Sequence, residues 1–387
     1  MKILVLGAGK MGRGAVHDLA HNSPGVESVT VADADIRMAE LIAKLNSDKI
    51  ACEARQIDVT DYARTVELMR GHNAAISCVP YFYNFQLAEA AVEAGINFCD
   101  LGGNNSVVEQ ELGLDAQAKA AGINIIPDCG LAPGMVSILA MHGAARFDEI
   151  ESIKIRVGGL PQQPQPPLDY QLVFSVEGLI NEYIEPARLI REGEIIEVES
   201  LTEIEELEFE GFPRLEAFQT SGGTSTLPNT FLGKIKNLDY KTIRYKGHCE
   251  RFKTLVDLGF ASSEPAVVKT GTGDSVQISP RAFLADALMR HLPRGEPDLV
   301  LIRLEFGGKI KGEEKLLRYD IVDRFDPETD LTAMMRTTAF PASIIAQMTA
   351  RGETLQRGAT PQEVAIEPDK FIAELARRNI TIQENFI

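Results

Sequence analysis

The most constraining feature of the sequence lies at its start, where an apolar run at residues 2–6 leads directly into a G-x-G-x-x-G turn at residues 7–12. An unbroken apolar run is typical of a buried parallel strand. A turn of this kind directly after one predicts a helix whose first N–H groups can hold the diphosphate of a dinucleotide. The residues that we expect to contact such a cofactor here are Gly7, Gly9, Lys10, Met11 and Gly12.

The end of the next expected strand supports this interpretation. Residues 28–32 are a second strand candidate, and Asp33 follows it. A carboxylate at this place can accept hydrogen bonds from both ribose hydroxyls of NAD and would repel the 2′-phosphate of NADP. Arg37 lies close enough to serve a 2′-phosphate, and an Asp that only caps a helix is the structural alternative. The sequence therefore favours NAD over NADP as cofactor.

Strands and helices continue to alternate through the first third of the chain. Helices are expected at 36–45, 62–69 and 87–94, and strands at 52–57, 74–79, 96–99 and 123–126. Such alternation predicts an α/β fold of the Rossmann type, a doubly wound parallel sheet with helices on both faces. Ligands of such sheets bind outside the carboxyl ends of the strands, where the strand order reverses.

Residues at these strand ends are therefore the next candidates. Beside the cofactor we expect the residues at or just after the ends of the third and fourth strands, namely Asp58, Val59, Cys78, Val79 and Pro80. Tyr81 and Asp100 come next to the expected nicotinamide position, where they could handle a proton of the substrate. A packed loop aromatic and a turn-forming Asp are the alternatives for these two residues.

Beyond residue 130 the regular alternation stops. Strand candidates at 153–157, 205–210, 240–245 and 299–306 are separated by helices and long loops, which predicts an inserted α+β domain on a mostly antiparallel sheet. We place the dinucleotide-binding domain at 1–130 and the substrate and oligomerisation domain at 131–330. The helices expected within 331–387 would pack back onto the first domain.

Three groups of the second domain could meet a substrate. Arg244 alternates with Ile243 and Tyr245 along a strand, so it would face away from the core and could bind a carboxylate. A solvated strand face is the structural alternative. The loop 219–226, with Thr224 and Thr226, is rich in Gly and hydroxyl groups, as is typical of a ligand-contacting loop or a flexible one. Tyr170 lies in a further polar cluster. His248 could exchange a proton near neutral pH, although a lone His is more often structural.

Composition excludes several classes of protein. The net charge is −17 and no basic cluster occurs, which argues against nucleic acid as partner. No apolar run is long enough to cross a bilayer, and no signal peptide precedes the first strand. Five widely spaced cysteines without C-x-x-C, and no metal-ligand spacing, predict neither disulfides nor a metal site. A cytoplasmic enzyme with a small-molecule substrate is expected.

Several longer segments resemble the saccharopine dehydrogenase family. They are VLGAGKMG at 5–12, DLGG at 100–103, IIPDCGLAPGM at 125–135, VGGLP at 157–161, PPLDY and VFSVEGL within 166–179, EAFQTSGGTSTL at 216–227, and YKTIRYKGH and FKTLVDLGF within 240–260. Within the family, the TSGGTSTL segment is most similar to lysine 6-dehydrogenases. The tail from residue 298 onward resembles saccharopine reductases more.

The resemblance implies a Rossmann domain with an inserted catalytic domain, a homo-oligomer, and NAD-linked oxidative deamination of L-lysine at its ε-carbon. The products would be 2-aminoadipate semialdehyde, which cyclises to piperideine-6-carboxylate, and ammonia. Saccharopine or carboxynorspermidine, both secondary amines, are the alternative substrates, and extra carboxylates could use Arg156, Arg188 or Arg214. A non-catalytic NAD-binding regulator is the alternative from another class.

Overall fold

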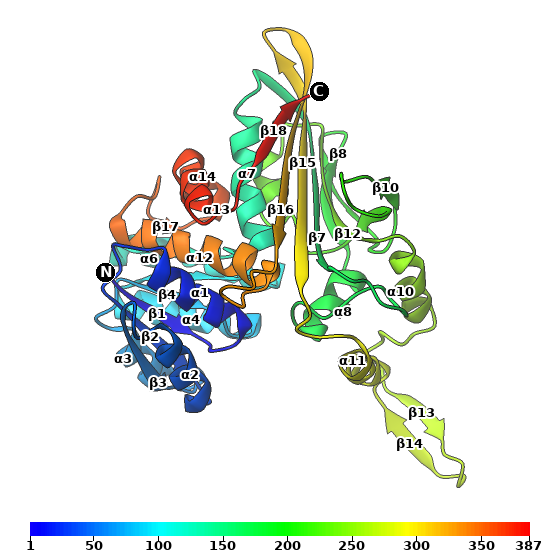
Figure 1. The fold of residues 1–387 in the computed structure, drawn as a ribbon, viewed down its shortest axis with the longest axis horizontal. Coiled ribbons are helices and arrows are strands. Elements are labelled where there is room, and N and C mark those ends of the chain that lie inside the picture. The colour runs from blue at the N-terminus through cyan, green and yellow to red at the C-terminus, as the bar shows by residue number, and fades with distance from the viewer.

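The computed structural model describes all residues, 1–387, and divides the chain between two large sheets (Figure 1). The first sheet has seven strands in the order β17-β6-β5-β4-β1-β2-β3, all parallel. The order reverses between β1 and β4, as expected of the Rossmann type. Its strands are β1 (Lys2–Leu6), β2 (Ser28–Asp33), β3 (Ala51–Gln56), β4 (Ala74–Ser77), β5 (Asn97–Asp100), β6 (Asn124–Ile126) and β17 (Gly358–Ala359).

Six helices connect the strands of this domain and cover both faces of its sheet. The helices are α1 (Lys10–His21), α2 (Ile36–Asn46), α3 (Tyr62–Met69), α4 (Asn84–Ala94), α5 (Asn105–Leu112) and α6 (Asp115–Ala121). A 3₁₀ turn at Tyr81–Tyr83 and an irregular π-type turn at Leu131–Met135 complete it. The expected α/β fold and its parallel sheet are confirmed.

The second sheet is mixed and mostly antiparallel. Its main order is β10-β11-β12-β7-β15-β16-β18, with β8 and β9 attached to β12, and only the pair β7 and β12 is parallel. Its strands are β7 (Glu149–Pro161), β8 (Ala187–Arg191), β9 (Glu194–Val198), β10 (Glu205–Leu207), β11 (Leu215–Gln219), β12 (Asn237–Tyr245), β15 (Asp298–Ile310), β16 (Glu313–Arg324) and β18 (Gln383–Phe386). A separate hairpin, β13 (Ala266–Lys269) and β14 (Ser275–Ile278), projects beyond α11 (Pro280–His291) (Figure 1).

Helix α12 (Ala333–Arg351) joins the two halves, because it packs against α1, β4 and β5 on one side and β15 on the other. In Figure 1 it lies between the two sheets. The remaining helices are α7 (Val136–Ala144), α8 (Val176–Ile184), α9 (Leu227–Phe231), α10 (His248–Asp257), α13 (Gln362–Ala365) and α14 (Pro368–Arg377). None of the helices combines the length and the apolar character needed to span a membrane.

Candidate functional site

The glycine turn has the geometry that a diphosphate needs. Gly7 has a φ of +101°, and a Cβ at Gly12 would overlap the carbonyl oxygen of Gly7, so both positions require glycine. At Gly9 a Cβ would meet nothing within 4 Å, so this residue borders open space. Gly9 is also the N-cap of α1 and forms no side-chain cap, which leaves the first amides of the helix, starting at Lys10 and Met11, available to an anion. These residues fit a bound dinucleotide.

Asp33 is tied to the same turn. Its Oδ2 accepts a hydrogen bond from the Ala8 N–H at 2.7 Å, and its Oδ1 accepts one from the Asp35 N–H at 2.8 Å. Each carboxylate oxygen keeps a second lone pair for a ribose hydroxyl. Arg37, whose side chain is 85% exposed, forms a salt bridge with Asp35 at 2.7 Å. Asp33, which can bind a ribose, and the exposed cation of Arg37 are thus both linked to Asp35.

The loop after β4 lies against the glycine turn. A Cβ on Gly7 would come within 2.8 Å of the Cys78 carbonyl oxygen and 3.2 Å of Val79 Cγ1. Burial raises the pKa of the Cys78 thiol, so this cysteine is no nucleophile at neutral pH. Pro80 leads into half-buried Tyr81, whose ring packs on Gly103.

The two residues expected after β3 lie farther out on the surface. Asp58 is exposed, and its side chain accepts hydrogen bonds from Thr60. The Val59 carbonyl accepts a hydrogen bond from Gln86 Nε2 at 3.3 Å, which links this loop to α4.

Asp100 is fully buried, and both of its oxygens have neighbours. Oδ1 accepts from the Gly102 N–H at 2.6 Å and the Asp128 N–H at 3.3 Å. Oδ2 has no N–H or O–H donor near it unless Glu111 on α5 is protonated, and the Glu111 carboxyl likewise has no donor of its own. Burial, then the adjacent charge of Asp100, raises the pKa of Glu111 well above its usual range. Glu111 therefore keeps its proton and donates a hydrogen bond to Asp100. With both oxygens engaged inside the protein, Asp100 stabilises the loop after β5 and does not face open space.

Asp128, at the end of β6, links the two domains. Its Oδ2 accepts from the Ser225 hydroxyl, which belongs to the loop expected to contact substrate. Burial, followed by the charge of Asp100, raises the pKa of Asp128 to about 8. Glu363 continues this polar layer, because its Oε1 accepts from the hydroxyls of Thr226 at 2.8 Å and Thr230 at 2.7 Å.

The loop 219–226 is not a flexible solvent loop, because its hydroxyl side chains are buried. Thr224 Oγ1 donates to the Arg188 carbonyl oxygen at 2.7 Å, and Thr226 is engaged with Glu363. Thr220 Oγ1 lies 2.7 Å from Thr242 Oγ1 on β12. The loop is thus a fixed wall between the second sheet and the first domain.

Arg244 lies in a buried aromatic cluster, and its side chain is only 3% exposed. We expected it to face away from the core, but both faces of β12 are covered. Its Nε donates to the Tyr183 hydroxyl at 2.8 Å and its Nη1 to the Ile243 carbonyl at 2.9 Å. The guanidinium lies 4.7 Å from the centroid of the Tyr170 ring. Nη2 makes no hydrogen bond, and its nearest acid is Glu182 at 3.9 Å.

His248 holds this cluster in place and is not open to a substrate. It is 1% exposed, and burial, then the charge of Arg244, lowers its pKa to about 3. The neutral ring donates from Nδ1 to the Leu168 carbonyl at 2.9 Å, so Nε2 accepts from the Tyr183 hydroxyl at 3.0 Å. The structure therefore places His248 two hydrogen bonds behind Arg244, with both of its ring nitrogens engaged within the protein.

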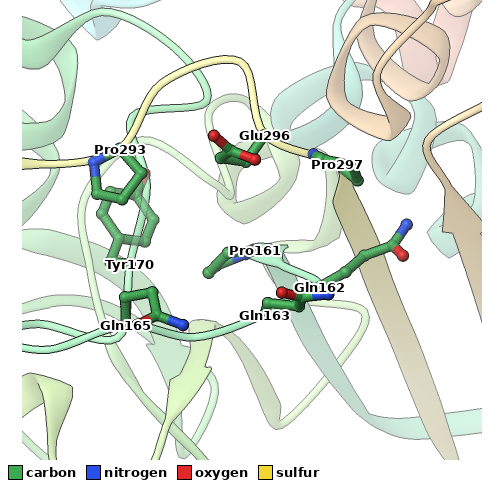
Figure 2. Close-up of a pocket in the computed structure, with 8 residues that line it drawn as sticks. All are labelled: Pro161, Gln162, Gln163, Gln165, Tyr170, Pro293, Glu296 and Pro297. Carbon is green, nitrogen blue, oxygen red and sulfur yellow. The ribbon is translucent and has the colours of Figure 1, made fainter.

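A pocket of about 340 Å³ has one residue of this cluster, Tyr170, in its lining (Figure 2). Tyr170 lies at one side of it, and its buried hydroxyl has no hydrogen-bond partner. The other residues of the lining are Pro161, Gln162, Gln163, Gln165, Pro293, Glu296 and Pro297.

The additional arginines considered for further carboxylates have other positions. Arg156 binds Glu205 and Asp239, and it lies on the face of the second sheet opposite to Arg244. Arg188 donates to Asn229 Oδ1 at 2.9 Å. Arg214 lies in a separate hollow beside Arg303. No group of three or more His, Cys, Asp or Glu side chains is arranged to hold a metal ion.

Several of these residues were not anticipated from the sequence. Asp128 follows a strand as Asp100 does, so its position could have been noticed. Glu111, Glu182 and Tyr183 lie within helices and Glu363 in a short helical turn, where only tertiary packing makes them part of the site.

Comparison with known families identifies both halves of the chain. Residues 3–126 match the saccharopine dehydrogenase NADP binding domain, and residues 130–380 match the saccharopine dehydrogenase C-terminal domain. The chain belongs to the saccharopine dehydrogenase family. This confirms the family resemblance of the sequence and the presence of an NAD(P)-binding domain, and it groups the chain with NAD(P)-dependent oxidoreductases. The choice between NAD and NADP is not resolved by the family.

The curated relatives differ in how much of their length the chain spans. Carboxynorspermidine synthase of Vibrio cholerae is 25% identical over 395 residues, covering 96% of this chain and 94% of the relative. Mitochondrial alpha-aminoadipic semialdehyde synthase of Bos taurus is 23% identical over 92% of this chain, which spans only 45% of that protein. Saccharopine dehydrogenase (NADP+, L-glutamate-forming) of Pyricularia oryzae is 26% identical, with 68% of this chain and 58% of the relative covered.

Solved structures agree on the fold. Apo saccharopine dehydrogenase (L-Glu forming) from Saccharomyces cerevisiae superposes with a TM-score of 0.80 at 19% identity, covering 100% of this chain and 99% of that one. Homospermidine synthase from Legionella pneumophila, solved with NAD, gives a TM-score of 0.69 at 12% identity, with 100% and 91% covered.

Proposed function

We propose that the protein is an NAD(P)-dependent oxidoreductase that acts on the C–N bond of a secondary amine carrying a carboxylate. The curated relatives named above are an alpha-aminoadipic semialdehyde synthase, a carboxynorspermidine synthase and a saccharopine dehydrogenase, and none is named for lysine 6-dehydrogenation. The comparisons therefore support the secondary-amine alternative better than the lysine reading. Among them, the carboxynorspermidine synthase matches this chain along nearly its whole length.

The proposal rests on one observation, that Nη2 of Arg244 has no hydrogen-bond partner in the protein. Burying a guanidinium is costly unless its donors are paired, and Nη2 of Arg244 reaches no hydrogen-bonding acid, because its ion-pair neighbour Glu182 stays 3.9 Å away. Here Tyr170 and Tyr183 flank the cation, and no protein acceptor lies within hydrogen-bond distance of Nη2. A substrate carboxylate would complete this site.

The chemistry needs a hydride transfer, a proton transfer and a water. Residues 7–12 would hold a dinucleotide, which would supply the acceptor for a hydride from the carbon next to nitrogen. The nitrogen loses one proton, water adds to the resulting imine, and the C–N bond breaks to give a carbonyl compound and a primary amine. The reverse sequence forms the secondary amine. Arg244 holds the carboxylate so that the reacting carbon is placed for the transfer.

We assign the transfer of the substrate's proton to Tyr81. It follows β4 at the edge where the strand order reverses, and it is only half-buried. Asp100 and His248, the other two candidates, have their hydrogen-bonding atoms engaged within the protein. Their roles are to shape the loop after β5 and to orient Arg244 through Tyr183.

A substrate panel tests the function. The purified protein is incubated with NAD or NADP and with saccharopine, carboxynorspermidine or L-lysine, and nicotinamide absorbance is followed. We expect turnover of a secondary amine. Turnover of L-lysine alone would replace the proposal by lysine 6-dehydrogenation, and silence with every amine would indicate a non-catalytic dinucleotide-binding protein.

Arg244→Ala tests the anchor in the same assay. Removal of a charged hydrogen-bonding partner should raise KM for the amine by roughly tenfold to a hundredfold. Arg214→Ala, which removes an exposed cation from the separate hollow, is the matched control and should leave KM unchanged. An unchanged KM in Arg244→Ala would remove this residue from the carboxylate role.

Cofactor choice is tested at Asp33, the last residue of β2, and at Arg37 in the first turn of α2. Asp33→Ser removes the acceptor for the ribose and should weaken NAD more than NADP. If NADP is used at all, Arg37→Ala should weaken NADP and leave NAD unchanged, because Arg37 is free to turn from Asp35. Equal effects on both cofactors would contradict the assignment of these two residues.

A further inference from the structure

The hairpin β13–β14 has one apolar face and one mixed face. Residues directly opposite each other on antiparallel strands point to the same side of the sheet. One face therefore carries only apolar side chains, from the pairs Val268 with Val276 and Ala266 with Ile278. The other face carries mostly polar side chains, from the pairs Val267 with Gln277 and Lys269 with Ser275. We call the first of these the apolar face of the hairpin.

The apolar face is left uncovered by the rest of the chain. Val268, Val276 and Ile278 are all exposed. The hairpin projects beyond α11, away from both large sheets (Figure 1). A two-stranded hairpin is only marginally stable in water unless its apolar face packs against another element. The element that covers this face must therefore come from outside the chain.

Exposed apolar side chains continue from the base of the hairpin onto the body of the domain. Leu258 and Phe260 follow α10 and are 69% and 37% exposed, and Phe283, in the first turn of α11, is 59% exposed. The Arg281 N–H donates to the Ser262 carbonyl at 3.0 Å, so these two segments lie side by side. We call Leu258, Phe260 and Phe283 the body patch.

The two surfaces differ in what they could bury between two copies of the chain. Two hairpins that covered only each other would bury about 500 Å² in total, taking roughly 150–250 Å² for a fully exposed large side chain. This is below the roughly 1,000 Å² that a specific interface needs. If the hairpin of each copy covers the body patch of the other, the total rises to about 1,200 Å². Only this reciprocal arrangement, which has two-fold symmetry, is large enough.

The charge of the hairpin also favours a second copy as the partner. The chain carries a net charge of −17, so two copies repel each other over most of their surfaces. Within residues 265–279 only Lys269 and Asp274 are charged, and their charges cancel. A contact through this segment therefore adds no repulsion. An anionic membrane or a nucleic acid would need a basic cluster, which the hairpin lacks.

We propose that the hairpin is a dimerisation arm. Its apolar face docks on the body patch of a second copy of this chain, and the arm of that copy docks on the first in return. The inference does not depend on the substrate, so the substrate panel and the following experiments succeed or fail separately.

Sedimentation velocity of the full chain over a range of protein concentrations tests the arm. We expect the native protein to be a dimer. Val268→Lys should raise the dissociation constant of the dimer at least about tenfold, because it places a charge against apolar side chains. Val267→Lys introduces the same charge on the other face of the hairpin and is the matched control, which should leave the dimer unchanged. A monomeric native protein, or equal dissociation constants of the two variants, would overturn the inference.

A second variant tests the body patch. Phe283→Glu should also raise the dissociation constant at least about tenfold, for the same reason. Circular dichroism checks that each variant remains folded, as expected of substitutions at exposed positions. A dimer that Phe283→Glu leaves intact would contradict the reciprocal arrangement.

Mixing the Val268→Lys and Phe283→Glu variants provides the specific test. In the mixed dimer one arm and one body patch are both native and face each other, and at the other contact the new lysine meets the new glutamate. We therefore expect the mixture to form dimers at concentrations where each variant alone is monomeric. A loss of dimers through misfolding would not be reversed by mixing, so a mixture that stays monomeric would overturn the inference.

Discussion

At the scale of single residues, the three glycines of the first turn have different physical reasons to be glycine. Gly7 adopts a φ of +101°, Gly12 lies against the Gly7 carbonyl, and Gly9 borders empty space. The sequence motif alone predicted all three as cofactor contacts. The structure shows that Gly7 and Gly12 are needed for the fold itself, whereas Gly9 is needed only when a ligand approaches.

Paired variants separate these two requirements. Gly9→Ala should leave the melting temperature unchanged within about 1 °C, because the backbone there is extended and the added Cβ meets nothing, but it should weaken dinucleotide binding at least about tenfold. Gly12→Ala should lower the melting temperature because its Cβ overlaps the Gly7 carbonyl. Both are measured by thermal unfolding and by calorimetric titration with NAD and NADP. Unchanged affinity in Gly9→Ala would mean that the diphosphate lies elsewhere.

The burial of Arg244 and the hydrogen-bond partners of His248 could not be predicted from the neighbouring residues in the sequence. Alternation along the strand correctly separated Arg244 from Ile243 and Tyr245, but it could not reveal that both faces of β12 are buried. The relay from Leu168 through His248 and Tyr183 joins residues that are distant in sequence, so no local pattern contains it.

At the scale of elements, the helices and strands of the first domain were largely predictable, because parallel strands buried on both faces give unbroken apolar runs. The expected helix at 62–69 is observed as α3, and the expected strand at 52–57 is β3, shifted by one residue. Strand β16 was missed because one face carries charged residues such as Arg318 and Asp320 that pair across the sheet. Strands β17 and β18 were missed because each is defined by a distant partner, β6 and β16.

A buried ion pair links the end of α14 to α1. Arg378, just after α14, donates to Asp18 of α1 at 2.6 Å and to Glu374 at 2.7 Å, and the side chains of Arg378 and Asp18 are both 0% exposed. Arg378→Ala would leave Asp18 buried without its cation, at a cost of about 3–5 kcal/mol. We expect the melting temperature to fall by roughly 10 °C.

Arg377 offers the matched control for this prediction. Its side chain is 71% exposed and pairs with Glu374 within the helix. Arg377→Ala should change the stability by less than about 1 kcal/mol. Similar melting temperatures of the two variants would show that the contact with Asp18 does not hold the C-terminal helix to α1.

At the scale of the whole molecule, the two domains meet through polar groups as well as through α12. Asp128 and Glu363 reach from the first domain and the C-terminal segment to Ser225, Thr226 and Thr230 of the second domain. The sequence predicted the loop 219–226 as a contact region but could not show that it is fixed between domains. The expected homo-oligomer stays a prediction, which sedimentation velocity of the purified chain measures directly.

This polar layer makes the stability of the molecule depend on pH in a definite direction. The ordinary pKa of Asp128 is 3.8, and burial raises it to about 8 in the folded protein. A raised folded-state pKa means that the unfolded chain binds fewer protons between these two values. The contribution of Asp128 to stability is therefore fully present below about pH 4 and is lost progressively up to about pH 8.

Asp128→Asn isolates this contribution, because the amide keeps the shape of the side chain but cannot ionise. The melting temperature of the variant minus that of the native protein should rise between pH 4 and pH 8 and stay constant above, because the native protein alone loses stability in that window. Asp48→Asn, at a side chain that is 67% exposed, is the control and should give a difference that does not change with pH over this range. A flat difference for Asp128→Asn would mean that Asp128 is already ionised in the folded protein at low pH. The layer between the domains would then hold a charge, and its hydroxyl donors alone would have to stabilise that charge.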